Sequence, residues 1–251
     1  MKWSTVSKCL VVLAAAGYIF GTSCSARKDA STQSETGPSS GDASRAQTSW
    51  DFDSQKVGSV PPGWKVTETG GKGKPVKWQV VADTTAPSAA QVLALTETLN
   101  TGNTMNLLMA VNLKLKDLDL EVRVKVISGK HNQGSGVIWR AVDANNYYLA
   151  RWTGLSNNFR VYCIKDGNPK RLATVDIAAD PKAWHTIKIT HQGERIVASL
   201  DGVKFMEVND ATFGEAGMIG LCTKADATAA FDDLKAQAIP PQSPRPEKEQ
   251  E

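Results

Sequence analysis

Between residues 134 and 201 the sequence is a succession of short segments in which apolar and polar residues alternate. Each segment is bounded by Asn, Asp, Gly or Pro, the residues that favour turns. Alternation with a period of two is typical of a strand that has one buried face. The pattern predicts an antiparallel meander with strands over residues 136–140, 147–152, 159–165, 170–177, 184–191 and 195–200.

The same rhythm continues on both sides of this meander. Short strand-like segments precede it at residues 50–53, 65–67, 78–81 and 91–95, and others follow at 203–208 and within 218–234. Residues 118–127 alternate most cleanly, because every second residue from Leu118 to Val126 is apolar and those between are charged. Asp201-Gly202 is a signal for a two-residue hairpin turn. No segment of useful length has a helical period, so the sequence predicts a β-sandwich.

The composition fits one exported domain that contains a substantial core. Apolar residues make up 41% of the chain, and seven tryptophans supply large side chains to bury. Lys and Arg exceed Asp and Glu by three, and two of the lysines, Lys2 and Lys8, lie in residues 1–23, the leader described below. The mature chain is therefore almost neutral. Because no basic stripe is interleaved with aromatic residues, we expect no nucleic-acid partner.

Residues 1–23 read as an export signal, because a basic start is followed by an apolar run too short to span a membrane. The stretch Gly21-Thr22-Ser23-Cys24 resembles a bacterial lipoprotein box, in which the cysteine carries lipid and becomes the first mature residue. Gly21 departs from that pattern, which usually has a bulky aliphatic residue there. We expect lipidation at Cys24, and simple secretion is the alternative.

Polar segments flank the expected domain at residues 50–238. Residues 24–49 are too polar to pack and read as a disordered tether, and residues 239–251 form a Pro-rich, charged tail. Together with the leader, the tether predicts a membrane-anchored protein in the periplasm or on the outer-membrane face. The oligomeric state stays open.

Six stretches carry a resemblance to a known superfamily. They are GVIWRAVDANNYYLARW, FRVYCIKDG, AWHTIKIT, SLDGVKFMEV, AGMIGLCTKAD and AAFDDL. These stretches resemble the concanavalin A-like lectin/glucanase sandwiches, and among them bacterial domains of the 3-keto-disaccharide hydrolase and laminin-G-like types. The resemblance implies a jelly roll of two curved antiparallel sheets whose concave sheet often forms a sugar groove. Its motifs fix turns and core, so they transfer the fold better than the function.

The resemblance leaves the function open between binding and catalysis. The Glu-x-Asp-x-(x)-Glu triplet of the related β-glucanases does not occur in this sequence, which disfavours their mechanism. We therefore expect a non-catalytic carbohydrate-recognition module first. The alternatives are a hydrolase or lyase that acts on 3-keto-disaccharides or related glycosides, and a protein-interaction scaffold. No cofactor is expected beyond a structural calcium ion.

Aromatic and arginine side chains crowd two neighbouring predicted strands and are the candidates for ligand contact. Aromatic rings stack on sugars, and guanidinium groups bind vicinal hydroxyls. The candidates are Trp139, Arg140, Tyr148, Arg151 and Trp152, of which we expect Arg140, Arg151 and Trp152 to contribute most. The alternative is that strand alternation turns about half of them into the core.

Two further sets of residues suggest structural roles. Asp51, Asp53, Asp232 and Asp233 lie on the expected first and last strands, which we expect to run side by side, and their oxygens suit calcium. Capping of turns and strand ends is the alternative for these aspartates. The histidines, His131, His185 and His191, are expected to be solvated rather than to bind metal.

Two cysteines, Cys163 and Cys222, lie inside the expected domain. Export places them where disulfides persist, so a bond between them is one expectation. The other is two buried free thiols, since free cysteine is among the most buried residue types.

Overall fold

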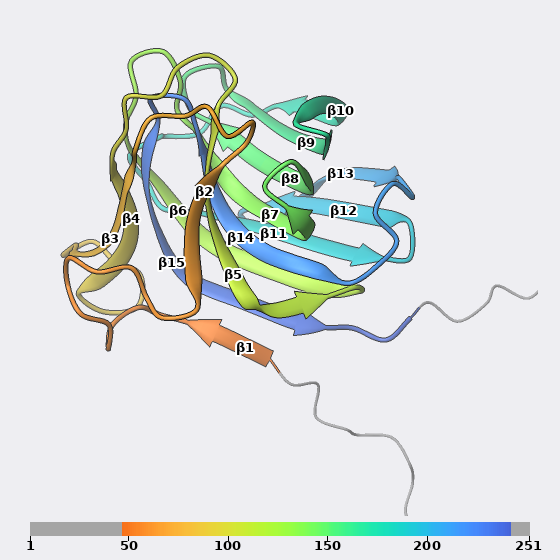
Figure 1. The fold of residues 1–251 in the computed structure, drawn as a ribbon, viewed down its shortest axis with the longest axis horizontal. Helices are drawn as coiled ribbons and strands as arrows, with labels where there is room; N and C mark the ends of the chain where they lie inside the picture. Colours follow the sequence, from red (N-terminus) through yellow and green to blue (C-terminus); the bar gives the residue numbers. More distant parts are fainter. Residues whose placement is uncertain (1–46, 242–251) are drawn as a thin grey trace, which may run out of the picture. The chain divides into compact units, whose positions relative to one another are not determined.

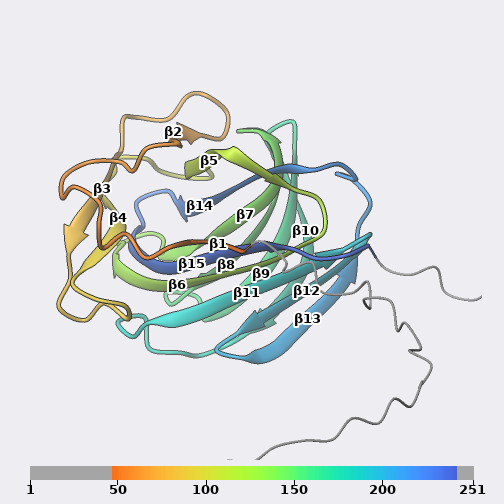
Figure 2. The same ribbon diagram turned by 90° about the horizontal axis from the view of Figure 1, so that it is seen from below.

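The computed structural model describes residues 47–241, and these residues form an all-β fold without a helix (Figure 1). Two antiparallel sheets lie face to face (Figure 2). Sheet A has the spatial order β13 (Val203–Asn209), β12 (Arg195–Leu200), β11 (His185–Gln192), β6 (Leu118–Ser128), β15 (Thr228–Ala238), β4 (Gln91–Glu97) and β3 (Lys77–Ala82), with β1 (Gln47–Trp50) paired to β15. Sheet B has the order β10 (Asn168–Asp176), β9 (Asn158–Lys165), β8 (Asn146–Thr153), β7 (Gly134–Asp143), β14 (Gly217–Lys224), β5 (Met105–Leu115) and β2 (Trp64–Glu68).

This architecture is the predicted jelly-roll sandwich. The meander expected from the alternating segments corresponds to β7 to β12, of which β7 to β10 are consecutive neighbours in sheet B and β11 and β12 are neighbours in sheet A. Asp201 and Gly202 both have positive φ angles, 51° and 79°, as a primed hairpin turn between β12 and β13 requires. Within the part of the chain that the structure describes, no helix is long and apolar enough to cross a membrane.

The main core lies between the two sheets, and β6 shows why the alternating pattern leads there. Leu118, Leu120, Val122 and Val124 are fully buried against the opposite sheet. The charged residues that alternate with them face outward, and Lys125, the next in this series, pairs with Asp83 at 2.5 Å. Each fully buried aliphatic side chain stabilises the fold by about 1.5–3 kcal/mol relative to an exposed one. A shift of register by one residue would expose all four, so this buried face fixes the register of the strand.

The eleven-residue strand β5 was not among the strands expected from the sequence. Its first half is buried on both faces, since Leu108 packs between the sheets and Leu107 packs on the opposite side of sheet B. A strand that is buried on both faces is a continuous apolar run without alternation, which periodicity alone does not identify as a strand.

The outer face of sheet B is concave and carries a second apolar cluster. Its buried members are Met105, Leu107, Met109, Ile138, Ala141, Tyr147, Leu149, Ile164 and Cys222. Since the described strands form only two layers, these side chains are buried by the curvature of the sheet and by loops at its rim. The loop after β2 is one of them, because Thr69 shares a 2.6 Å hydrogen bond with the hydroxyl of Tyr147.

Candidate functional site

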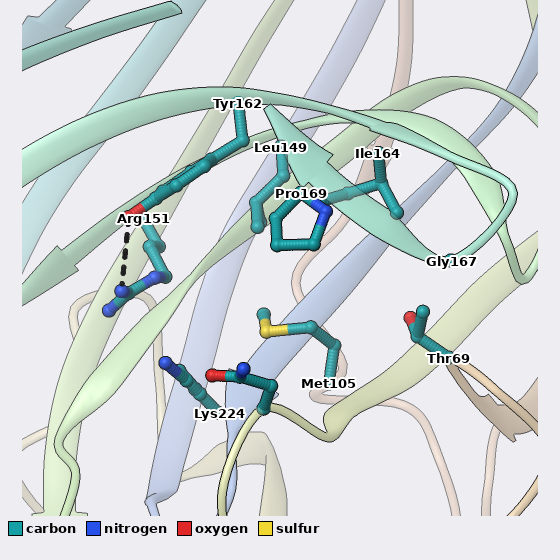
Figure 3. Close-up of a pocket in the computed structure, with 10 residues that line it drawn as sticks. Thr69, Met105, Leu149, Arg151, Tyr162, Ile164, Gly167, Pro169 and Lys224 are labelled. Carbon is teal, nitrogen blue, oxygen red and sulfur yellow. Dashed lines mark hydrogen bonds between the residues drawn. The ribbon is translucent and has the colours of Figure 1, made fainter. Parts of the chain in front are cut away.

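A pocket of about 180 Å³ opens on the concave face of sheet B (Figure 3). Strands β5, β8, β9 and β14 provide most of its lining, and loops next to β2 and β10 complete its rim. The lining residues are Thr69, Asn103, Met105, Leu149, Arg151, Tyr162, Ile164, Gly167, Pro169 and Lys224. The polar groups of Arg151, Tyr162 and Lys224 gather on one side, and Leu149, Ile164 and Pro169 provide an apolar wall (Figure 3).

Arg151 lies in the middle of the concave sheet, and only 5% of it is exposed. The register pairs it with Gly136 on β7 and with Arg160 on β9. A Cβ atom at Gly136 would come within 2.0 Å of the carbonyl oxygen of Ala150, and one at Gly134 within 2.5 Å of Nη1 of Arg151. The two glycines therefore place no side chain on this face of β7, and the long side chain of Arg151 lies over the strand at these positions.

The hydroxyl of Tyr162 lies between two guanidinium groups. Nη2 of Arg151 and Nη1 of Arg160 both donate to this hydroxyl, each at 3.4 Å. The guanidinium of Arg151 also lies 5.6 Å from the centre of the Tyr162 ring, within the range of a cation–π contact. Arg160 has a further partner, because its Nε donates to the Thr174 hydroxyl at 3.2 Å.

The pKa values in this cluster follow from burial and from positive charge. The pKa of Lys224 is lowered by burial and by the neighbouring charges of Arg151 and Arg160. Burial alone would raise the pKa of Tyr162, but the charges of Arg151 and Arg160 outweigh it and lower that pKa. Both shifts have the direction that a local excess of positive charge produces.

Carboxylates do not balance this charge. Among the described residues that line the pocket there is no Asp or Glu. Within residues 47–241, none of Arg151, Arg160 and Lys224 has a carboxylate oxygen within ion-pair distance. The pocket is therefore a small cationic site beside an apolar wall.

Of the residues predicted to contact a ligand, the structure brings only Arg151 into this pocket. Trp139, Tyr148 and Trp152 lie between the sheets with no exposed surface, so the expectation that they face a groove is wrong. Strand alternation explains the difference, since Arg151 and Trp152 are adjacent in β8 and point to opposite faces. Trp152 packs in the core and makes a tilted ring contact with His185, with the ring centres 4.7 Å apart.

Arg140 was also expected at the groove, and it is instead buried at one end of the sandwich. A register shift in β7 and a φ angle of 44° turn it away from the concave face. Its guanidinium donates to the carbonyl oxygens of Lys116, Phe213 and Gly193 at 2.7–3.0 Å and to the Asp117 carboxylate at 3.0 Å. All of its nitrogen atoms have partners, which is the arrangement of a structural ion pair.

The histidines were expected to be solvated, and two of the three are buried. His191 is enclosed in the core, where its Nδ1 accepts a 2.9 Å hydrogen bond from Nε1 of Trp139. Burial and the charge of Arg140 lower its pKa to about 3, so it is neutral at ordinary pH. His185 bonds to Asp201 at 2.8 Å, and Trp184, not His185, faces outward on sheet A.

The four aspartates proposed for calcium are held by hydrogen bonds and an ion pair within the protein. Asp53 and Asp232 both accept hydrogen bonds from Ser88 at 3.0–3.1 Å, and Asp233 pairs with Arg123 at 3.3 Å. Asp51 accepts a bond from the backbone of Asp53, as in a turn. In residues 47–241, no three His, Cys, Asp or Glu side chains come together as metal ligands would. The first and last strands, β1 and β15, run side by side as expected, but Asp51 and Asp53 lie in the turn after β1 and not on the strand.

Cys163 and Cys222 are both free and buried. They lie on β9 and β14, which are separated by β7 and β8, so about three strand spacings or roughly 14 Å lie between them. They also point to opposite faces of sheet B. A disulfide needs Cα atoms within about 7 Å, so this fold excludes the bond and confirms the other expectation, two buried free thiols.

Arg160, Tyr162 and Lys224 were not among the ligand-contact residues predicted from the sequence. The first two were accessible from the sequence, because a hairpin between residues 147–152 and 159–165 pairs Arg160 with Arg151 and places Tyr162 on the same face. Lys224 comes from β14, far away in the chain, and no local signal places it there. Cys24, the expected lipidation site, lies outside the described residues.

The fold agrees with comparisons with known proteins. Solved structures with a similar fold include the carbohydrate-binding module CBM66 from Bacillus subtilis, 18% identical over 70% of this chain and 96% of the module, with a TM-score of 0.56. A second is the cellulose-induced protein Cip1, which is 14% identical over 76% of this chain and 97% of that protein, with a TM-score of 0.57. A third is a β-glucanase from Bacillus licheniformis, which is 12% identical over 78% of this chain and 100% of the enzyme, with a TM-score of 0.53. At such identities these likenesses establish the fold alone. No curated protein matches this chain in sequence.

The sequence itself identifies the family. Residues 51–237 match the model of the 3-keto-alpha-glucoside-1,2-lyase-like domain. The matched segment contains both sheets of the sandwich except the short strand β1 and the last residue of β15. Because this match covers most of the chain, the protein belongs to the family of 3-keto-alpha-glucoside-1,2-lyase-like domains.

Proposed function

We propose that this protein is an exported lipoprotein whose sandwich domain binds a carbohydrate in the pocket of sheet B without converting it. The observation that carries the proposal is the two-sided lining of the pocket, in which the donors of Arg151 and Lys224 face apolar side chains. A sugar ring offers hydroxyl oxygens at its edge and C–H groups on its face, so it suits such a lining. The fold shared with a carbohydrate-binding module supports the same conclusion.

A binding role ranks before hydrolysis because the pocket lacks the usual chemical groups for it. Most glycoside hydrolases use two carboxyl groups, one as an acid and one as a base or nucleophile. The described residues that line the pocket include no Asp or Glu. Recognition needs only donors and an apolar surface, and the pocket provides both.

Elimination is the second candidate function, and one observation favours it. Lys224 has a lowered pKa and lies beside the guanidinium of Arg151. On a 3-keto-glucoside, its neutral amine would take the proton from C2. The electron pair would form the C1–C2 double bond and break the C1–O bond, and the leaving oxygen would take up a proton. Arg151 would stabilise the negative charge that develops on the keto oxygen. The family's name is consistent with this reaction.

Two assays on the chain without its leader separate these functions. A glycan array tests binding, and incubation with 3-keto-glucosides tests turnover. We expect saturable binding to a subset of glycans and no release of the aglycone. Release that disappears in Lys224→Gln, with normal folding, would replace the binding role by the elimination reaction. An absence of both binding and release would contradict both functions.

The proposed location rests on the leader, Cys24 and the polar tether. A lipid on Cys24 would hold the domain at a membrane, in the periplasm or on the outer-membrane face, and simple secretion is the alternative. Radiolabelled fatty acid and fractionation of cells that express the full chain test the anchor. We expect Cys24→Ser to lose both the label and the membrane fraction, whereas unchanged labelling would contradict the proposal.

A further inference from the structure

The sandwich contains two buried arginines on neighbouring strands, and they differ in one respect. Arg140 on β7 is 1% exposed, and all of its guanidinium nitrogens have acceptors, one of them a carboxylate. Arg151 on β8 is almost as buried, yet within residues 47–241 its Nη1 has no hydrogen-bond partner at all. Among the residues that the structure describes, its only hydrogen bond is the long one from Nη2 to the Tyr162 hydroxyl.

An unsatisfied charged donor is costly to bury. Removing a charged group from water without a counter-ion is strongly unfavourable, and folded proteins normally compensate with a paired charge or hydrogen bonds. Arg140 has that compensation from Asp117. Arg151 lacks it, and Arg160 and Lys224 add further positive charge around it. The described residues therefore leave an excess of positive charge at this site, which an anion would balance.

The size and lining of the pocket limit which anion fits. About 180 Å³ is below the usual 300–1,000 Å³ of a ligand pocket and suits a single ring rather than a chain of sugars. Leu149, Ile164 and Pro169 would remain unused by a small inorganic anion, because they offer only apolar contact. A planar carboxylate matches a guanidinium fork, with which it forms two parallel hydrogen bonds.

We propose that the pocket recognises an acidic sugar residue at the end of a glycan, with its carboxylate bound between Arg151 and Lys224 and its ring against the apolar wall. This assignment rests on the proposed carbohydrate-binding function and names the ligand class of the same site. Tyr162 holds Arg151 in position from the other side through its hydroxyl and its ring. Arg160, on the neighbouring strand β9, adds positive charge that attracts the carboxylate without contacting it.

Calorimetry on the chain without its leader tests the assignment with matched probes. The methyl glycosides of glucuronic and galacturonic acid are compared with the corresponding neutral hexosides, and with inorganic sulfate and phosphate. We expect one uronide to bind at least about 10-fold more tightly than its neutral counterpart, the ratio typical of a hydrogen bond to a charged group. Arg151→Gln is expected to remove this preference.

Two further variants keep the test decisive. Lys224→Gln should also reduce the preference and provides the answer if Arg151→Gln does not fold. Arg195→Gln is the control, because Arg195 forms an exposed pair with Glu207 on sheet A and should leave the affinities unchanged.

Equal affinity for uronide and hexoside would overturn the proposal of an acidic ligand and leave sugar binding intact. Sulfate or phosphate binding as tightly as the uronide would also overturn it, as an inorganic anion site. No binding of any probe would contradict this assignment, and an empty glycan array in addition would contradict sugar binding itself.

Discussion

A Cβ atom on Gly134 would lie 2.5 Å from Nη1 of Arg151. The guanidinium thus occupies the space that the side chain of any residue other than glycine at position 134 would fill. The shape of the pocket therefore depends on glycine at this position. The contact would be made by the far end of a long side chain, so Arg151 can move away from an added methyl group. Substitution at Gly134 therefore tests the position of Arg151 without removing its charge.

Gly134→Ala is expected to weaken glycan binding by about 10-fold or more, because it displaces the guanidinium from its position beside Tyr162 and Lys224. The free energy of unfolding should change by roughly 1 kcal/mol or less. Gly214→Ala is the matched control, since no atom lies within 4 Å of a Cβ placed there. Calorimetry and chemical unfolding measure the two effects. Unaltered affinity in Gly134→Ala would argue against a role for Arg151 in binding.

Arg140 should matter for stability and not for ligand affinity. Arg140→Met leaves the Asp117 carboxylate without its ion-pair partner in the interior and is expected to cost about 3–5 kcal/mol of unfolding free energy. The comparison is Lys77→Met, which removes the exposed pair with Glu97 and should cost at most about 1 kcal/mol. Urea unfolding gives both values. Similar costs for the two variants would show that the buried pair contributes no more than the exposed one.

Local pattern predicted the architecture well, because one buried face per strand produces a period of two. It predicted the face of each side chain less well wherever that period breaks. The shift of register after Trp139 turned Arg140 into the interior, and the inward direction of His185 reversed the expected orientation of Trp184. Strand β5, buried on both faces, was missed for the same reason.

The site was only partly accessible from the sequence. Arg151 was expected to contact a ligand, and the structure places it in the pocket. The pairing of β8 with β9 adds Tyr162, which local reasoning could have reached. Lys224 and Met105 arrive from strands far away in the chain, and only the order of strands in sheet B brings them together. Long-range strand order does not follow from local periodicity.

His191 should give the protein a measurable pH dependence. Its folded pKa of about 3 lies below the unfolded value of about 6.5, so below pH 6.5 the unfolded state binds more protons than the folded state. Stability should therefore fall as the pH decreases from 6.5 toward 3, by up to about 1.4 kcal/mol per pH unit from this group. Between pH 6.5 and 5, the free energy of unfolding, measured with urea, should decrease less steeply in His191→Gln than in the wild type. Parallel curves would contradict a neutral buried histidine.

Both domain cysteines should remain reduced in the oxidising compartment to which we propose that the protein is exported. Burial raises the pKa of the Cys222 thiol to about 12, and three strand spacings keep it from Cys163. Alkylation under denaturing, non-reducing conditions, followed by peptide mass spectrometry, should find both thiols modified on protein exported by its own leader. A cross-linked peptide that contains both residues would contradict the fold described for sheet B.

The most direct test of the carbohydrate pocket observes the methyl group of Met105 by NMR. Met105 lines the pocket, whereas Met206 lies in the core on β13 of sheet A and provides an internal control. The chain without its leader, labelled with ¹³C at its methionine methyl groups, is titrated with the glycan that binds most tightly on the array. The Met105 signal should shift in proportion to saturation while the Met206 signal stays in place. A saturable shift at Met206 with none at Met105 would contradict a binding site on the concave face of sheet B.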